Sequence, residues 1–384
     1  MSSTDTSDEG IDVFAIVDYN AEEVSAVAAV LLAVDNTTDL LFHSSELNHL
    51  DQNYVDPAGG VTDQLGALTR MPSLFATMTN MTVDMFNELS AAVCPVIQSH
   101  ARSTGDAHPG RGHSPKLSPE QRLLLFLLFL KHDNLCVFDG HHWNWSKSSV
   151  NDDSIFVSSC VNAAIANEIR WPTEHERRAA GTRLADFPGC IGHIDGTLVK
   201  IRRPHRDPLH SRWFNGRKKI YCVNNTVAVD HDGLFIFIDC GYPGSFHDIT
   251  ILRHSQLHAN WRDHFVHEDN YFQYLLGDPG YTGEDMYIMR RVARREIEAG
   301  SEAVIDAFNS MHAGRRVRVE WGIGGLKRKW KRLMKQFDST KPKFALIFRS
   351  ACLLTNFIHR RRQNMKIVLD ADDANEGGGW DGGN

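Results

Sequence analysis

The sequence contains little cysteine and no long apolar segment. Its seven cysteines are scattered through 384 residues without any CxxC pair. This argues against a disulfide framework and a cysteine zinc site, and it favours a reducing compartment. The longest apolar runs, Val24–Val34 and Leu123–Leu130, are too short to cross a bilayer. The chain also lacks the basic and apolar start of a signal peptide, so we expect a soluble intracellular protein without membrane contact.

Basic residues are absent from both ends of the chain. Residues 1–69 contain 13 Asp and Glu and residues 370–384 contain five, with no Lys or Arg in either segment. The formal net charge of −7 therefore leaves +11 on residues 70–369. A basic body between acidic ends fits a protein that binds a polyanion and limits non-specific contact. A solvated tail without a role explains residues 370–384 equally well.

The first part of the chain, residues 1–116, is expected to be acidic and partly helical. Helical patterns cover residues 21–34 and 73–89, and the polar stretch 99–116 indicates a linker or exposed loop. A firmer helix begins at Ser118-Pro119-Glu120-Gln121, which has the spacing of a capping box with proline at the first helical position. The apolar run that follows predicts a buried helix.

Residues 117–187 predict a helical region that resembles a helix-turn-helix. Apolar residues recur on one helical side after the polar segment, namely Ile155, Val157, Val161, Ile165 and Ile169. Lys147 and the serines beside it could touch DNA phosphates or base edges. The alternative is a plain helical bundle that packs on the next domain. Asp152-Asp153 favours that alternative, because carboxylates repel phosphate.

From Pro188 the pattern changes to short strands, which opens a domain expected to end at residue 369. The predicted strands are Cys190–Ile201, Ile220–Val229, Leu234–Cys240 and Tyr274–Leu276. A hairpin turn is expected at 230–233, and helices at 247–257, 314–335 and 344–362. Three strands, a helix, a fourth strand and further helices form the order of an RNase H-like fold. We therefore expect an α/β protein whose mixed sheet is flanked by helices.

Four acids lie in this domain at positions suited to metal-dependent chemistry. Asp195, Asp248 and Asp278 each lie at or just beyond a predicted strand, and Glu320 opens a basic helix. Carboxylates from separate elements can hold two Mg²⁺ or Mn²⁺ ions, which activate an oxygen nucleophile and stabilise the leaving oxygen in phosphodiester chemistry. In an RNase H-like sheet, strands one and four are neighbours, so Asp195 and Asp278 should meet.

Each acid also has a structural interpretation. Asp195 and Asp278 could be turn residues, and Asp248 could cap the helix that follows it. Glu320 could pair with Arg315, Arg316 or Arg318 on its own helix. His247 is expected to be a hydrogen-bonding neighbour more than a third kind of ligand. The order and context of the four acids favour the catalytic interpretation.

Two basic clusters accompany the acids. Residues 200–219 hold eight Lys and Arg against one acid, and residues 314–335 hold nine against Glu320 alone. Such patches supply the phosphate attraction that dominates nucleic-acid affinity. The candidate DNA-binding residues are Lys147, Arg202, Arg203, Arg217, Lys218, Lys219, Lys327, Arg328 and Lys329.

At these residues the chain resembles the PIF/Harbinger transposases and their domesticated nuclease relatives, a DDE-type superfamily. The resemblance rests on FPGCIGHIDGTLVKIRRP, RKKIYCVNNTVAVDHDGLF, GYPGSFHDITILRHSQL, GDPGY and RRVRVEWGIGGLKRKWKRL, over roughly residues 118–360. It implies an RNase H-like nuclease with Mg²⁺ or Mn²⁺, cleavage at terminal inverted repeats, and joining of the freed 3′-hydroxyl to target DNA. It also implies a separate Myb-like DNA-binding partner. We expect a nuclear homo-oligomer.

Position by position, the resemblance makes Asp195, Asp248, Asp278 and Glu320 the catalytic and metal-binding residues. Whether Asp248 or Asp278 is the middle acid stays open: strand order favours Asp278, and the PGSxHD motif gives Asp248 a metal contact. Phe246 and Pro279 depart from the family's usual residues. One alternative function is a domesticated DNA-binding regulator that no longer cuts, and another is a nuclease for RNA or structured DNA.

Overall fold

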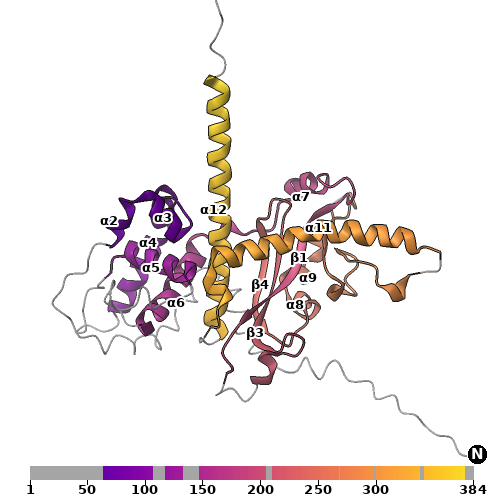
Figure 1. Cartoon of the computed structure of the whole chain (residues 1–384), viewed down its shortest axis with the longest axis horizontal. Coiled ribbons are helices and arrows are strands. Elements are labelled where there is room, and N and C mark those ends of the chain that lie inside the picture. The colour runs from indigo at the N-terminus through magenta and orange to yellow at the C-terminus, as the bar shows by residue number, and fades with distance from the viewer. Residues whose placement is uncertain are drawn as a thin grey trace, which may run out of the picture.

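A helical region and a mixed sheet lie on either side of one long helix, α12 (Lys341–Glu376), as Figure 1 shows. The computed structural model describes residues 64–106, 117–132, 147–204, 210–267, 269–297, 300–337 and 341–376. The helix expected at residues 21–34, most of the acidic N-terminal segment and residues 377–384 lie outside this part. Within it, no helix combines the length and the apolar character needed to span a bilayer.

The helical region consists of helices that precede the sheet in the chain. They are α2 (Gln64–Thr69), α3 (Pro72–Thr79), α4 (Val83–Asp106), α5 (Pro119–Lys131), α6 (Lys147–Ala164) and the 3-10 turn η5 (Ala166–Glu168). The predicted capping box is confirmed: Ser118 Oγ accepts from Gln121 N, and Gln121 Oε1 accepts from Ser118 N. The helix expected over 73–89 is broken at Asn80, whose left-handed backbone (φ 67°) ends α3. Asparagine tolerates this conformation better than most residues.

The polar stretch from residue 99 was expected to be a loop, and this is wrong for its first part. Helix α4 continues to Asp106, while residues 107–116 lie outside the described part. The sequence pattern misses this because Gly, Ser and His lower helix propensity only weakly against an established helix.

The sheet has the order β4-β3-β1-β5-β6, with β2 beside β3. Its strands are β1 (Cys190–Lys200), β2 (Phe214–Asn215), β3 (Ile220–Val229), β4 (Phe235–Pro243), β5 (Tyr274–Leu276) and β6 (Ile288–Met289). Strand β1 is antiparallel to β3 and parallel to β5, and β5 is parallel to β6. The four predicted strands are therefore confirmed, and the first and fourth of them are neighbours. The two-residue strands β2 and β6 carry no sequence pattern of their own.

Two local features set the register of β3 and β4. The predicted hairpin turn is confirmed: Asp230 N donates to Leu234 O, and Gly233 has a φ of +83° that glycine adopts without strain. Further along, the β3–β4 pairing shifts between Asn224 and Asn225. Asn225 spans this irregularity, since its Nδ2 donates to Thr197 O and its Oδ1 accepts from Gly241 N.

Helices cover both faces of the sheet. One face packs against α11 (Glu302–Lys329), which crosses in front of β1 in Figure 1, and against α12. The other packs against α8 (Asp248–His254), α9 (Gln256–Ala259) and α10 (Trp261–Phe265). The remaining elements are α7 (Glu174–Gly181) and the 3-10 turns η6 (His210–Trp213), η7 (Pro279–Tyr281), η8 (Arg294–Glu296) and η9 (Lys331–Met334). The helix expected at 344–362 is present and longer than predicted, whereas the one expected at 314–335 begins earlier and ends at Lys329, before the 3-10 turn η9.

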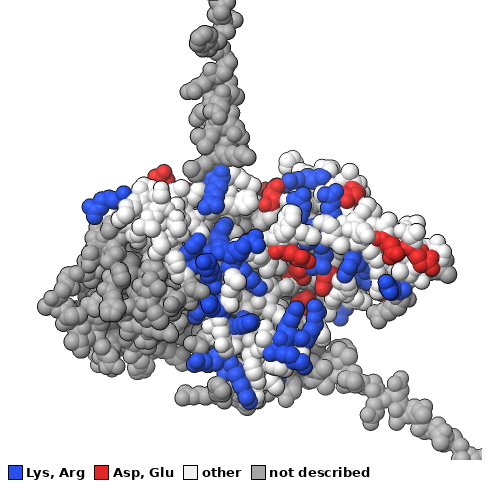
Figure 2. Space-filling model, viewed as in Figure 1, with Lys and Arg blue, Asp and Glu red and all other residues white. Residues whose placement is uncertain are grey.

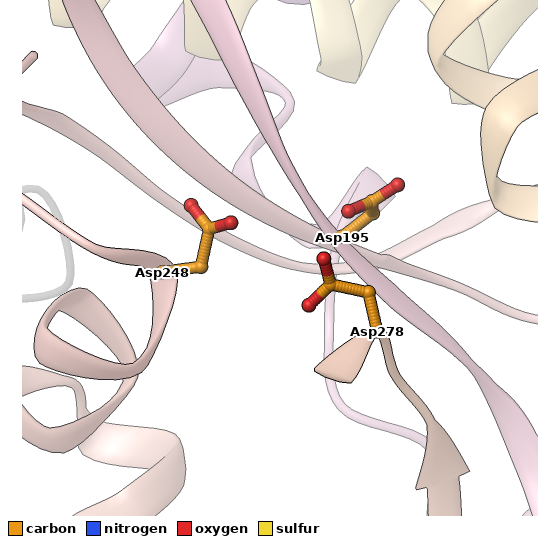
Figure 3. A group of neighbouring side chains, drawn as sticks. All are labelled: Asp195, Asp248 and Asp278. Atoms are coloured by element: carbon orange, nitrogen blue, oxygen red, sulfur yellow. The ribbon is translucent and has the colours of Figure 1, made fainter. Parts of the chain in front are cut away.

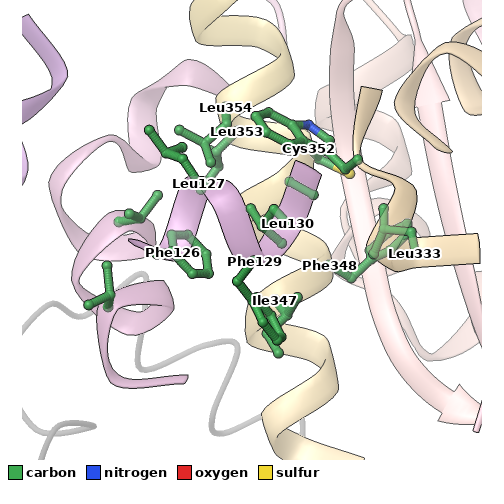
Figure 4. Close-up of a cluster of buried hydrophobic side chains, with 14 of the residues drawn as sticks. Phe126, Leu127, Phe129, Leu130, Leu333, Ile347, Phe348, Cys352, Leu353 and Leu354 are labelled. Carbon is green, nitrogen blue, oxygen red and sulfur yellow. The ribbon is translucent and has the colours of Figure 1, made fainter. Parts of the chain in front are cut away.

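The core runs continuously from the helical region to the sheet through α12. Figure 4 shows side chains of α5 and α12 packed together, with Leu333 at the edge of the group. The same buried cluster includes Val199, Val223 and Val227 of the sheet. All eight residues of the run Leu123–Leu130 are buried because α2, α3, α4, α6 and η9 pack around α5, together with side chains of α12. The predicted buried helix is thus confirmed.

Candidate metal and nucleic-acid site

Asp195 lies in the middle of β1, where its side chain is half-buried. The strand forms because apolar residues such as Ile194 and Val199 fill opposite faces of a central strand. Asp195 interrupts this apolar pattern. Its Oδ1 accepts a hydrogen bond from Gly196 N at 2.9 Å.

Asp278 follows β5, and the parallel pairing of β5 with β1 brings it to Asp195. The ladder places His193 opposite Leu276. Two residues further along each strand are Asp195 and Asp278. Asp278 then caps η7, and its Oδ1 accepts from Gly280 N at 2.8 Å. The predicted meeting of these two acids is confirmed.

Asp248 is the first residue of α8 and reaches the same place from the other side of β1. A Cβ added to Gly196 would lie 2.2 Å from Asp248 Oδ1, so the carboxylate occupies the space that a side chain at 196 would fill. Asn224 Nδ2 holds Asp248 in place by donating to its Oδ1 at 3.0 Å and to Phe246 O at 3.0 Å. Asp248 does not cap α8, because the capping position is His247.

The three aspartates form one cluster. Each offers a carboxylate oxygen, and these oxygens lie within 4.8 Å of one another. Figure 3 shows the carboxylates gathered around β1, with that of Asp278 directed toward Asp248. Oxygen ligands at this separation, from three separate elements, fit a hard divalent cation such as Mg²⁺ or Mn²⁺. The donor set therefore fits the metal that the sequence predicts.

Burial and mutual repulsion make the cluster costly without a cation. Burial raises the pKa of Asp195 to about 6; Arg316 lowers it, and the Asp278 and Asp248 carboxylates raise it. Burial also raises the pKa of Asp248, which Asn224 counteracts by its hydrogen bond. Carboxylates whose pKa is raised by neighbouring carboxylates are a common feature of metal sites, because a bound cation removes the repulsion.

Glu320 lies outside the cluster of three aspartates. Its side chain is 60% exposed on α11, and its Oε1 is 3.8 Å from Arg316 Nη2. The same Nη2 donates to Asp195 Oδ2 at 2.7 Å. Arg316 thus links Glu320 to the aspartates, one helical turn away. The ion pair that the sequence offered as a structural interpretation of Glu320 is present.

Sequence reasoning missed three residues that shape the site. Gly196 leaves room for Asp248, and Asn224 orients it. Tyr281 is fully buried, and burial together with the three carboxylates raises the pKa of its hydroxyl far above its usual range, so it stays protonated. A signal for Asn224 was available, because Asn224-Asn225-Thr226 is a polar run inside an otherwise apolar strand.

The predicted DNA-binding residues fall into groups around the acids. Figure 2 shows Lys and Arg gathered over α11 and the sheet on the face where acids are also exposed. Arg217, Lys218 and Lys219 are exposed in the turn between β2 and β3, and Arg217 lowers the pKa of Asp248. Arg202 and Arg203 are exposed after β1, while Arg206 and Asp207 lie outside the described residues.

On α11, Arg328 is exposed and Lys327 and Lys329 are half-buried. Lys327 Nζ donates to Leu198 O at 3.0 Å, so this lysine has a protein partner in addition to any phosphate.

The helix-turn-helix interpretation depends on α5, α6 and the segment between them. Residues 133–146 lie outside the described part, and Lys147 is described only as the first residue of α6. The apolar side of α6 packs against α4, α5 and α12. Asp153 forms an ion pair with Arg122 of α5, with its Oδ1 2.8 Å from Arg122 Nε, and so does not face outward. These contacts are those of the helical bundle; DNA recognition here stays a prediction.

The similarity of this chain to known proteins agrees with the chemistry of this site. Residues 194–356, less than half of the chain, match the family described as DDE superfamily endonuclease. The range contains all four candidate acids. A protein of Arabidopsis thaliana called Protein ALP1-like is 30% identical over 101 residues, which cover 26% of this chain and 24% of that protein. The chain thus matches about a quarter of the length of that relative. No solved structure matches.

Residues 194–356 therefore have the features of a DDE superfamily endonuclease domain, a class that uses divalent metal on DNA. The mixed sheet flanked by helices and the cluster of acids are consistent with that class. At this level the predicted nuclease- or transposase-like function is supported.

Proposed function

We propose that the protein is a metal-dependent DNA endonuclease of the DDE transposase type, built on an RNase H-like core. The observation that carries the proposal is the cluster of Asp195, Asp248 and Asp278, brought together from β1, α8 and the end of β5. The strand order β4-β3-β1-β5-β6, in which β3 is antiparallel to both β4 and β1 and β5 is parallel to both β1 and β6, supports the RNase H-like assignment. The match to DDE superfamily endonucleases supports the reaction type.

In this mechanism the three aspartates would hold the divalent metal, two ions, where β1, the end of β5 and the start of α8 meet. The metal supplies Lewis acidity at the phosphate and activation of the oxygen nucleophile. Asn224 keeps the Asp248 carboxylate in position, and Arg316 neutralises Asp195 and Glu320. Glu320, which lies on α11 beside Arg316, is the fourth acid of the proposal. Arg217, Lys218 and Lys219 attract the phosphates on either side.

The protein's resemblance to PIF/Harbinger transposases extends the proposal. Cleavage takes place at terminal inverted repeats, the freed 3′-hydroxyl attacks target DNA, and a Myb-like partner assists recognition of the ends. The protein acts in the nucleus as a homo-oligomer. The basic segment His359-Arg360-Arg361-Arg362 is a weak candidate for a nuclear import signal, since Arg360 and Arg361 form ion pairs with Glu168.

The test is cleavage of supercoiled and linear DNA by the purified protein in Mg²⁺ or Mn²⁺. We compare Asp195→Ala, Asp278→Ala and Glu320→Gln with Asp306→Asn, which removes an exposed acid from the same helix α11. Cleavage should be lost in the first three and retained in the fourth, with DNA binding preserved in all. Cleavage that survives the loss of Asp195 would refute the proposed site.

One observation favours the alternative, a DNA-binding regulator that does not cut. Glu320 is largely exposed, and its charged partner is Arg316, which also forms an ion pair with Asp195. A regulator binds DNA without metal and keeps its affinity when the aspartates are replaced. Binding without cleavage in either metal, with or without a Myb-like partner, would support this alternative.

A further inference from the structure

A group of cations converges where the helical region meets the C-terminal ends of α5 and α11. Asn80, in the turn between α3 and α4, connects them. Its Oδ1 accepts from Lys131 Nζ at 2.5 Å, its backbone carbonyl accepts from Arg362 Nη2 at 3.0 Å, and its Nδ2 donates to Lys329 O at 2.8 Å. With Lys331, which lies close enough to lower the pKa of Lys131, these residues form what we call the Asn80 cluster.

The cluster holds four positive charges. Within the residues that the structure describes, Lys131, Lys329, Lys331 and Arg362 form no ion pair. Burial and then the charges of Arg362 and Lys131 lower the pKa of Lys329 to about 8. Burial and then Lys331 and Arg362 lower the pKa of Lys131. Like charges held together at partial burial raise the free energy of the folded protein.

A structural explanation accounts for only part of this charge. Lys131 and Lys329 each end a helix, where the helix dipole places roughly half a negative charge. Two helix ends therefore offset about one of the four positive charges. Lysines that only cap helices would also extend separately into solvent. Here Asn80 binds side chains or backbone from three helices and keeps the cations together.

The shape of the cluster favours an extended anion over a small one. Lys331 and Arg362 are exposed, and Lys131 and Lys329 are half-buried, so the charges lie along an open surface. Figure 2 shows that Lys and Arg continue across this face, over the crossing of α11 and α12, toward exposed acids. A polyanion with regularly spaced charges, such as the backbone of a DNA duplex, fits such a surface better than a single phosphate ion.

We infer that the Asn80 cluster is a second phosphate-binding site for the DNA duplex that enters the acidic site. This inference rests on the proposed function. Helix α11 carries both sites. Glu320 and Lys329 are nine residues apart on it, which corresponds to roughly 13 Å along the helix axis. That length equals about four base pairs of duplex. The cluster thus binds flanking DNA on one side of the cleaved bond and fixes the direction of the duplex.

The test measures the affinity of a 30-base-pair duplex against salt concentration, in EDTA so that no cleavage takes place. We compare Lys329→Gln/Lys331→Gln with Arg70→Gln/Arg294→Gln, which removes the same charge from exposed positions outside the cluster. Each lost phosphate contact lowers the slope of log affinity against log salt by about 1. The cluster variant should lose about 2 in slope and at least tenfold in affinity at physiological salt, and the control should lose much less. Lys329→Arg/Lys331→Arg should restore both.

A hydroxyl-radical footprint provides an independent measurement. In the cluster variant, protection should shorten on one side only, by about four base pairs. Equal slopes and equal footprints for the cluster and control variants would overturn the inference, as would a wild-type protein that binds no duplex. Cleavage by the wild type separates the two proposals. If the wild type cleaves DNA and the cluster variant binds the duplex as tightly as the control, only the role of the Asn80 cluster is refuted. If the wild type does not cleave DNA and the cluster variant binds the duplex more weakly than the control, only the nuclease proposal is refuted.

Discussion

Gly196 determines whether the acidic site can exist, although it carries no side chain. The Asp248 carboxylate occupies the space next to the Gly196 Cα. A methyl group there would meet both Oδ1 and Cγ of Asp248, and the aspartate side chain is too short to move aside and still reach the site. Glycine is therefore needed at position 196 of the DGT motif to make room for Asp248, and not to form a turn.

We expect Gly196→Ala to lower Mn²⁺ affinity and DNA cleavage by at least tenfold while the protein stays folded, because Asp248 is displaced. Isothermal titration with Mn²⁺ and a cleavage assay measure the two effects. Gly216→Ala is the matched control, since a Cβ at Gly216 meets nothing within 4 Å. Equal Mn²⁺ affinity in the two variants would contradict the role assigned to Gly196.

Metal binding should depend on pH because a proton competes for Asp195. Burial raises the pKa of Asp195 to about 6 in the metal-free protein. Below that pH the carboxylate is protonated and must lose its proton to bind a cation. Mn²⁺ affinity should therefore be level above pH 7 and fall by up to about tenfold between pH 6 and pH 5. Affinity that stays constant from pH 7 to pH 5 would show that Asp195 is not a ligand.

At the scale of elements, the sequence predicted what apolar patterns and turn residues determine. The strands β1, β3, β4 and β5 and the turn at Gly233 follow from them. The pairing of β1 with β5 followed from strand order, and it led to the meeting of Asp195 and Asp278. The sequence could not show that Arg316 links Asp195 to Glu320, because that contact depends on how α11 crosses the sheet. Asn80 was missed for the same reason, since its partners are 51 to 282 residues away.

The C-terminal end of α11 should carry a cost in stability that depends on pH. Burial and neighbouring cations lower the pKa of Lys329 to about 8 from 10.5. Between these values the unfolded chain binds more protons than the folded protein, so the free energy of unfolding rises with pH. The cost is fully present below pH 8.

Relative to Lys329→Gln, the wild type should gain on the order of 1 kcal/mol as the pH rises from 8 to 10. Urea unfolding at a series of pH values measures this difference. At pH 7 the variant should be at least as stable as the wild type. Parallel pH profiles for the two proteins would contradict the charge repulsion assigned to the cluster.

At the scale of the whole molecule, α12 makes the helical region and the sheet one cooperative unit. Phe348 of α12 is fully buried in the cluster that contains both α5 and the valines of the sheet. We expect Phe348→Ala to lower the free energy of unfolding by about 3–5 kcal/mol. Met334→Ala should change it little, because Met334 is 59% exposed.

Free cysteines report on the two parts separately. Cys94 and Cys160 are buried in the helical region, and Cys222 and Cys240 are buried in the sheet. In urea, both pairs should become reactive toward a thiol reagent at one and the same denaturant concentration within each protein. This concentration should be lower for Phe348→Ala than for the wild type. Labelling of Cys94 and Cys160 well before Cys240 would show that the helical region unfolds by itself.

The position of α12 after the helices and strands that it joins has a consequence for synthesis. Helices α4, α5 and α6 and the strands of the sheet are all made before residues 344–358, which fill the space between them. Until that segment leaves the ribosome, the apolar sides of the earlier elements have no partner, and contacts of long sequence separation form slowly. The nascent chain therefore completes this core only after residue 358 has left the ribosome, and until then it depends on chaperones for longer than a chain built from independent domains.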